Sequence, residues 1–83
     1  MANRKMESPD HRLLGEAVRE LRERHGLSQG ELAARTELSR RHLAAIERGD
    51  VDPTFLTLVR IARAVPAALA DLMLIFEERR QRG

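Results

Sequence analysis

Helix-capping signals recur at short intervals along this chain, and they constrain its fold more than any other feature of the sequence. Ser8-Pro9 places a capping serine before a proline that suits the first turn of a helix. Ser28-Gln29-Gly30-Glu31 is a capping box, in which the serine and glutamate side chains each accept a backbone N–H. Ser39 and Asp52-Pro53-Thr54 mark two further helix starts, with Asp52 as the expected cap of the second. Pro66 disfavours helix at the residue before it, so another helix begins beyond it.

Apolar residues between these signals recur at helical spacing, and no segment shows the alternation of a strand. Leu14, Val18 and Leu21, for example, share one face of the first segment. The pattern predicts an all-α fold with five helices, at residues 9–25, 29–36, 40–48, 54–64 and 67–80. We expect a single domain at 9–80, with a flexible N-terminal tail at 1–8 and a short tail at 81–83.

Composition argues against several classes of protein. The 83 residues contain no cysteine, so no disulfide or thiolate metal site is possible, and only two aromatic rings are available to stack single-stranded bases. The three histidines lie on separate segments, and no phosphate-binding glycine loop or catalytic triad is present. We therefore expect no enzyme, no cofactor, no metal and no small-molecule effector. No apolar run reaches the length of a membrane span, so we expect no membrane partner and a cytoplasmic, nucleoid-associated protein.

Two short helices between Gln29 and Arg48 are joined by only a few residues, and this stretch is the most informative part of the sequence. Ala33 is small at the place where the two helices would cross, which permits close approach at a steep angle. The apolar positions of the stretch are Leu32, Leu38, Leu43 and Ile46. A short connection of this kind is a helix-turn-helix, whose second helix can enter the major groove of DNA.

Three motifs stand in this part of the chain: Leu27-Ser28-Gln29, Glu31-Leu32-Ala33, and Ile46-Glu47-Arg48-Gly49 followed by Pro53. Through these motifs the chain resembles the XRE, or Cro/repressor-type, helix-turn-helix family over residues 13–72. The resemblance implies a compact five-helix, lambda-repressor-like domain that binds double-stranded operator DNA as a two-fold homodimer. Two positions depart from the family pattern: Glu37 stands where relatives often have glycine, and residues 65–68 replace a frequent glycine and serine cap.

The outward side of the second helix is the predicted reading surface. Arg40 and Arg41 lie near its N-terminal end, and an arginine fork matches O6 and N7 of guanine. His42 is a further candidate for a base edge or a phosphate. By resemblance, Ala45 also falls where relatives read bases, and its methyl group suits thymine. In a chain this rich in arginine, composition alone favours the interpretation that Arg40 and Arg41 are merely solvated surface charges. Their place in the motif favours contact with bases instead.

Other residues are predicted to contact phosphates, which fixes register without reading sequence. Gln29 begins a helix whose first N–H groups favour an anion, and the resemblance implies a phosphate contact for it. Ser39, Arg48 and Arg35 are the remaining candidates.

Glu47 lies beside this surface, where a carboxylate would repel phosphate. The resemblance implies that Arg22, on the first helix, pairs with Glu47 and is oriented by it. The other interpretation is two unrelated surface charges, which would contribute little to stability. We expect the pair, in a structural role.

The last two helices carry more apolar residues than one inward face needs. The predicted core residues of these helices are Phe55, Leu58, Ile61 and Ala62, and then Leu69, Leu72, Met73 and Phe76. The excess predicts contact with a second copy, although a helix folded back over the core would also cover it. The predicted dimer interface consists of Leu56, Val59, Leu72, Leu74, Ile75 and Phe76.

The sequence leaves two functions in competition. The first is a sequence-specific, homodimeric regulator that binds a short palindromic operator, and a phage switch, a restriction–modification controller and an antitoxin autorepressor all fit it. The alternative is a protein-interaction module or antitoxin-like adaptor with the same fold and weak or no DNA reading. Glu37, Asp50 and Asp52 favour the alternative because carboxylates near the reading surface repel phosphates. The residues that favour the regulator are Arg40, Arg41, Arg48 and Gln29.

Overall fold

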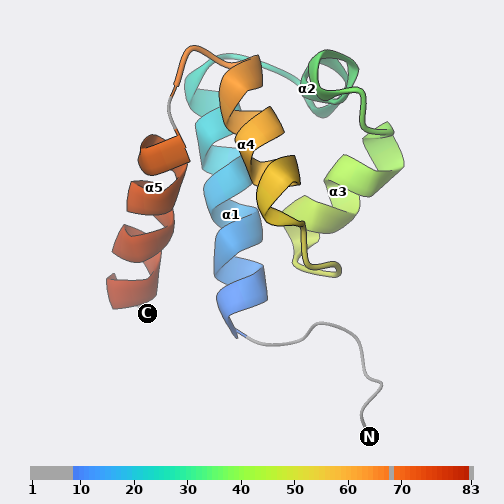
Figure 1. Cartoon of the computed structure of the whole chain (residues 1–83). Coiled ribbons are helices and arrows are strands. Elements are labelled where there is room, and N and C mark those ends of the chain that lie inside the picture. The colour runs from blue at the N-terminus through green and yellow to red at the C-terminus, as the bar shows by residue number, and fades with distance from the viewer. Residues whose placement is uncertain (1–8, 68, 83) are drawn as a thin grey trace, which may run out of the picture.

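The computed structural model describes residues 9–67 and 69–82, which form five α-helices and no strand. The helices are α1 (Pro9–Arg24), α2 (Gln29–Thr36), α3 (Arg40–Arg48), α4 (Phe55–Ala64) and α5 (Leu69–Arg82). α1 packs against both α3 and α5, while α2 contacts α3 and α4 (Figure 1). The all-α prediction and its five helices are confirmed, and α5 continues to Arg82, where a tail was expected. The predicted tail at 1–8 lies outside the described residues.

The predicted caps of α2 and α3 are present. Ser28 Oγ accepts the N–H of Glu31 at 3.0 Å, and the Glu31 carboxylate accepts the N–H of Ser28 at 2.8 Å. Hydrogen bonding of the Glu31 carboxylate to the backbone N–H of Ser28, and then to its side chain, lowers the pKa of Glu31. Ser39 Oγ accepts the N–H of His42 at 2.9 Å. The first residues of α2 and α3 are therefore determined by nearby side chains, the same serines and glutamate from which these helix starts were predicted.

The expected cap at Asp52 is wrong. Thr54 caps α4 instead, because its Oγ1 accepts the N–H of Thr57 at 3.1 Å. The Asp52 carboxylate lies 3.5 Å from Nε2 of His11, so it bridges the loop before α4 to the start of α1.

All five helices contribute side chains to one hydrophobic core. Its most deeply buried side chains are Val18, Leu32, Thr36, Leu43, Ile46, Ile61, Val65 and Leu72. Phe55 was expected among them, but it is 65% exposed, because α4 turns Leu58, Ile61 and Ala62 toward the core instead. No helix in the described ranges is both long and apolar enough to cross a membrane.

Part of the predicted dimer interface is wrong, because α5 turns two of the predicted residues into the core. Leu72 and Ile75 are only 0% and 2% exposed, so they belong to the core of the single chain. Arg79 lies one turn further along and its guanidinium contacts Glu16 at 2.9 Å and Glu20 at 2.8 Å, which ties α5 to α1. Burial opposes ionisation of Glu20, but hydrogen bonds from Arg79 and Arg24 outweigh it and lower the pKa of Glu20. Because Arg79 faces α1, the residues one turn before it face α1 as well.

Candidate nucleic-acid interface

The turn between α2 and α3 places Glu37 in the left-handed region, with φ 63° and ψ 23°. Its N–H donates to the carbonyl of Ala33, and the N–H of Leu38 donates to the same carbonyl at 3.1 Å. A left-handed conformation costs a non-glycine residue roughly 1–2 kcal/mol. This turn, at which the resemblance implies a frequent glycine, is therefore made here with a strained glutamate.

Replacing Glu37 with glycine should relieve this strain. We expect Glu37→Gly to raise the free energy of unfolding by up to about 1 kcal/mol, since the gain is partly offset by the flexibility of glycine in the unfolded chain. Urea denaturation of the variant and of the parent measures the difference. A matched Ala34→Gly change, in the middle of α2, should destabilise instead, by about 1 kcal/mol. Loss of stability in Glu37→Gly would contradict the proposed strain.

A glycine in α1 sets how closely α3 approaches. A Cβ atom added at Gly15 would lie 2.4 Å from the carbonyl oxygen of Ile46 and 2.5 Å from that of Glu47. The C-terminal half of α3 thus rests directly on the backbone of α1. Sequence reasoning missed this residue, although a glycine between Leu14 and Val18 on the inward face of a helix is the signal that would have found it.

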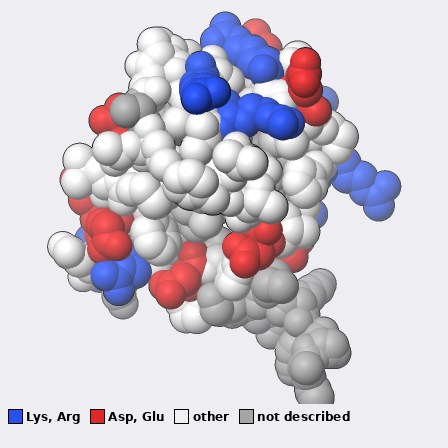
Figure 2. All heavy atoms as spheres, in the orientation of Figure 1, with Lys and Arg blue, Asp and Glu red and all other residues white. Residues whose placement is uncertain are grey.

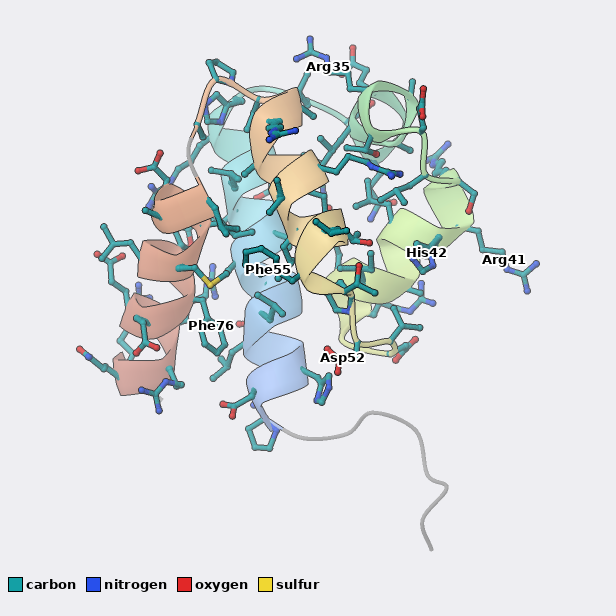
Figure 3. The ribbon with its side chains drawn as sticks, viewed as in Figure 1. Arg35, Arg41, His42, Asp52, Phe55 and Phe76 are labelled. Carbon is teal, nitrogen blue, oxygen red and sulfur yellow. The ribbon has the colours of Figure 1, made fainter. Side chains whose placement is uncertain are left out.

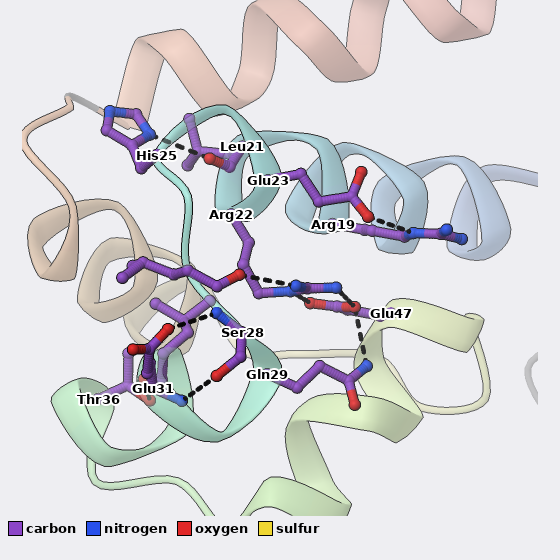
Figure 4. A network of polar contacts seen from close by, with 12 residues as sticks. Arg19, Leu21, Arg22, Glu23, His25, Ser28, Gln29, Glu31, Thr36 and Glu47 are labelled. Atoms are coloured by element: carbon purple, nitrogen blue, oxygen red, sulfur yellow. Dashed lines mark hydrogen bonds and ion pairs between the residues drawn. The ribbon is translucent and has the colours of Figure 1, made fainter.

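Arg22 and Glu47 form a buried ion pair between α1 and α3 (Figure 4). Arg22 Nε donates to Glu47 Oε2 at 2.7 Å and Nη2 donates to Oε1 at 3.0 Å, with the two side chains only 11% and 3% exposed. Hydrogen bonding to Glu47 raises the pKa of Arg22. The third arm of the guanidinium, Nη1, donates to the carbonyl of Leu27 at 2.9 Å and so holds the segment before α2. The structure therefore brings together the pair that the resemblance implied.

Gln29 joins the same network from α2. Its Nε2 donates to Glu47 Oε1 at 2.9 Å, so this carboxylate accepts hydrogen bonds from α1 and from α2 while belonging to α3 (Figure 4). This third partner of Glu47 was not predicted, because Gln29 was expected to contact a phosphate. Three helices are thus fixed relative to one another at a single carboxylate.

The N-terminal end of α3 presents its side chains to solvent. Arg40, Arg41 and His42 are exposed, and Arg41 extends away from the body of the molecule (Figure 3). Ala45 is half-buried on the next turn, while Leu43 and Ile46 are buried on the opposite side. The predicted reading residues therefore share one accessible part of α3, on a helix whose other side is held by α1 and α2.

The candidate phosphate contacts lie in different places. Ser39 is exposed beside the start of α3. Arg48 is also exposed, but its Nε donates to Asp50 Oδ2 at 2.8 Å, which gives this aspartate a partner that the sequence did not suggest. Arg35 lies over the end of α4, apart from Arg41, and its Nη1 donates to the carbonyl of Ala64 at 3.1 Å (Figure 3). The structure therefore does not bring Arg35 to the other candidates.

An open polar cleft lies where α1, α2 and α3 meet, next to the candidate phosphate contacts Gln29 and Arg48. It is lined by Arg19, Arg22, Glu23, Gln29, Ala44, Glu47 and Arg48. Each of its arginines is paired with a carboxylate, including Arg19 with Glu23 at 3.1 Å. Among the residues that the structure describes, no group of acids and histidines could hold a metal ion. The cleft and the end of α3 offer hydrogen-bond donors to an anion or to base edges.

Known proteins are similar to this chain in sequence and in fold. A family model described as Helix-turn-helix matches residues 18–72. The chain is 36% identical over 62 residues to the uncharacterized HTH-type transcriptional regulator y4dJ of Sinorhizobium fredii, a match to 75% of this chain and 80% of that protein. It is 38% identical over 61 residues to YgzD of Bacillus subtilis, described in the same words, with 74% and 92% covered.

A solved structure is similar as well. The restriction-modification controller protein C.AhdI from Aeromonas hydrophila aligns with a TM-score of 0.75 at 31% identity. This alignment covers 78% of the present chain and 98% of that chain.

Proposed function

This chain belongs to the XRE-type helix-turn-helix family of DNA-binding transcriptional regulators, and from that premise we propose that it is a homodimer that binds a short palindromic operator. In each protomer, α3 enters the major groove. The observation that carries this proposal is the group of exposed side chains at the N-terminal end of a helix whose orientation is fixed by Glu47.

The proposed base contacts come from α3. Arg40 and Arg41 each donate two hydrogen bonds to a guanine, and each such pair contributes about 1–3 kcal/mol of discrimination against other bases. His42 contacts a neighbouring base edge or phosphate. Ala45 is half-buried and offers only its methyl group, so it reads little beyond a thymine methyl.

The proposed phosphate contacts surround this helix. Gln29 offers the first backbone N–H groups of α2, and Ser39 lies at the start of α3. Arg48 lies at the end of α3, where a phosphate competes with Asp50 for its guanidinium. Each phosphate neutralised adds about 0.9 to the slope of log affinity against log salt concentration, so Asp50 keeps that slope shallow. Arg35 is not included, since it is held at the end of α4.

Homodimerisation supplies the symmetry of the operator. Two copies related by a two-fold axis place their α3 helices in major grooves about 34 Å apart. Occupancy then depends on protein concentration, because dimerisation and DNA binding are coupled by mass action. The similar protein C.AhdI is named a restriction-modification controller, and this likeness favours that role for the regulator proposed here.

Selection of binding sites from random double-stranded DNA tests this function. We expect an inverted repeat whose half-sites are one helical turn apart and contain guanines, and whose affinity falls with added salt. Enrichment of no sequence, with binding equally weak for all DNA, would instead favour the protein-interaction module. Enrichment of a single unrepeated half-site would reject the homodimer while keeping the DNA-reading role.

A further inference from the structure

One exposed side of the molecule, centred on α4, carries opposite charges at its two ends. Figure 2 shows mainly basic side chains at one end of this side, with acidic atoms at their edge, and mainly acidic side chains at the other, with basic atoms at their edge; uncharged atoms lie between the two ends. At the basic end, a shallow groove is lined by Arg35, Leu56, Val59, Arg60, Arg63 and Ala64. At the acidic end, a second depression is lined by Asp10, His11, Leu14, Asp52 and Phe76. We call this surface the α4 face.

The middle of the α4 face is apolar and uncovered. Phe55 is 65% exposed and Leu56 is 72% exposed, and they are two of the three large apolar side chains that the described residues leave in solvent. Adjacent exposed apolar side chains with a charged rim are typical of a surface that binds another protein. The charges at the two ends then decide which protein it is.

We propose that a second copy of this chain covers the α4 face end for end, so that the basic end of each protomer lies on the acidic end of the other. This proposal rests on the homodimer of the proposed function. In a two-fold interface the same patch serves both partners, so it must be complementary to itself. The α4 face meets this condition because Arg60 and Arg63 of one copy then approach the acidic end, Asp10 and Asp52, of the other.

The charges also select the direction of the two-fold axis. An axis that runs along α4 would place like charges against each other, which costs several kcal/mol in a protein interface. An axis that lies in the interface and crosses α4 exchanges the two ends and brings opposite charges together. The distribution of charge therefore favours the crossing axis.

The same axis suits the binding of DNA by both copies. α3 lies to one side of α4, and Arg41 extends further in that direction (Figures 1 and 3). Rotation about an axis that crosses α4 toward α3 leaves both α3 helices on the same side of the dimer. Rotation about an axis along α4 would send them to opposite sides. The charges on the α4 face and the position of α3 thus favour the same symmetry.

Leu74 belongs to a different surface. It is 59% exposed, but it lies in a cleft of α1 and α5 beside Leu21, Arg24 and His25. The predicted interface had placed Leu74 with Leu56 and Val59, whereas the structure separates these residues. Leu74 therefore provides a matched control for the α4 face.

An exchange of charges tests the arrangement in the intact chain. The acidic variant carries Arg60→Glu and Arg63→Glu, and the basic variant carries Asp10→Lys and Asp52→Lys. Sedimentation velocity without DNA should show the dimer dissociation constant raised about tenfold or more for each variant alone, because like charges then meet at both ends. An equimolar mixture should dimerise within about threefold of the parent, because its acidic and basic ends are complementary again.

Control variants distinguish a loss of the interface from a loss of folding. Arg60 donates to the carbonyl of Thr36 at 3.3 Å, and Asp52 contacts His11, so the single changes Arg63→Glu and Asp10→Lys are used if either double variant melts early. Leu74→Arg should leave dimerisation unchanged. Unaltered dimers of both variants, or a mixture as weak as its components, would overturn this interface. If the parent still selects a palindrome in that case, the proposed function stands and only the α4 face is wrong.

Discussion

Replacing Arg22 with alanine should lower the free energy of unfolding by about 3–5 kcal/mol, the usual cost of leaving one partner of a buried ion pair alone. Glu47 would keep a charge on a side chain that is 3% exposed, with Gln29 as its remaining side-chain donor. A domain of this size has only about 5–10 kcal/mol of stability in total, so the effect is large. DNA affinity should fall with it, because the same pair fixes α3 against α1.

Chemical denaturation and a matched arginine test this prediction. Arg24→Ala removes an exposed pair with Glu20 on the same helix, and should cost at most about 1 kcal/mol. The double change Arg22→Met with Glu47→Met should recover most of the lost stability, because an apolar pair of similar volume leaves no buried charge. A loss as small in Arg22→Ala as in Arg24→Ala would show that the pair is only a surface interaction.

Replacing Arg40 and Arg41 together with alanine should weaken binding to the selected operator by at least about 30-fold. Two bidentate contacts at the lower limit of about 1 kcal/mol each account for that factor, and stronger contacts would increase it. Stability should change by no more than about 0.5 kcal/mol, since both side chains are exposed and neither supports the core. Fluorescence anisotropy at fixed salt measures the affinity.

The matched control for this double variant is Arg80→Ala with Arg82→Ala. It removes the same two charges from α5, which does not contribute to the proposed reading surface. We expect its affinity for the operator to stay within about threefold of the parent, the range of a long-range change in charge. Equal losses in both double variants would mean that Arg40 and Arg41 act only through net charge.

Local signals predicted most of the fold. Ser28 and Ser39 satisfy backbone groups within one turn, so their sequence context alone determines where α2 and α3 begin. The rotation of α5 was not predictable in this way, because Leu72, Leu74 and Ile75 are all apolar and any of them fits an inward face. The choice is made by a contact with Glu16 and Glu20, which lie about sixty residues away from Arg79 in the sequence.

The parts of the candidate site that depend on local structure or on the family motif were predicted from the sequence. The exposure of Arg40 and Arg41 follows from the inward positions of Leu43 and Ile46 on a short helix. The contacts of Gln29 with Glu47 and the close approach at Gly15 were missed. They depend on how three helices cross, and the spacing of apolar residues within one helix carries no information about that.

The most direct test of α3 as the reading helix is methylation protection at guanine N7, the major-groove atom that an arginine fork contacts. On the selected operator, the parent should protect guanines in two symmetric groups one helical turn apart. The Arg40→Ala, Arg41→Ala variant, at a concentration that saturates the same DNA, should leave those guanines reactive. Guanines that stay reactive with the parent, or equal protection by the parent and the variant, would contradict the proposal that α3 reads the operator.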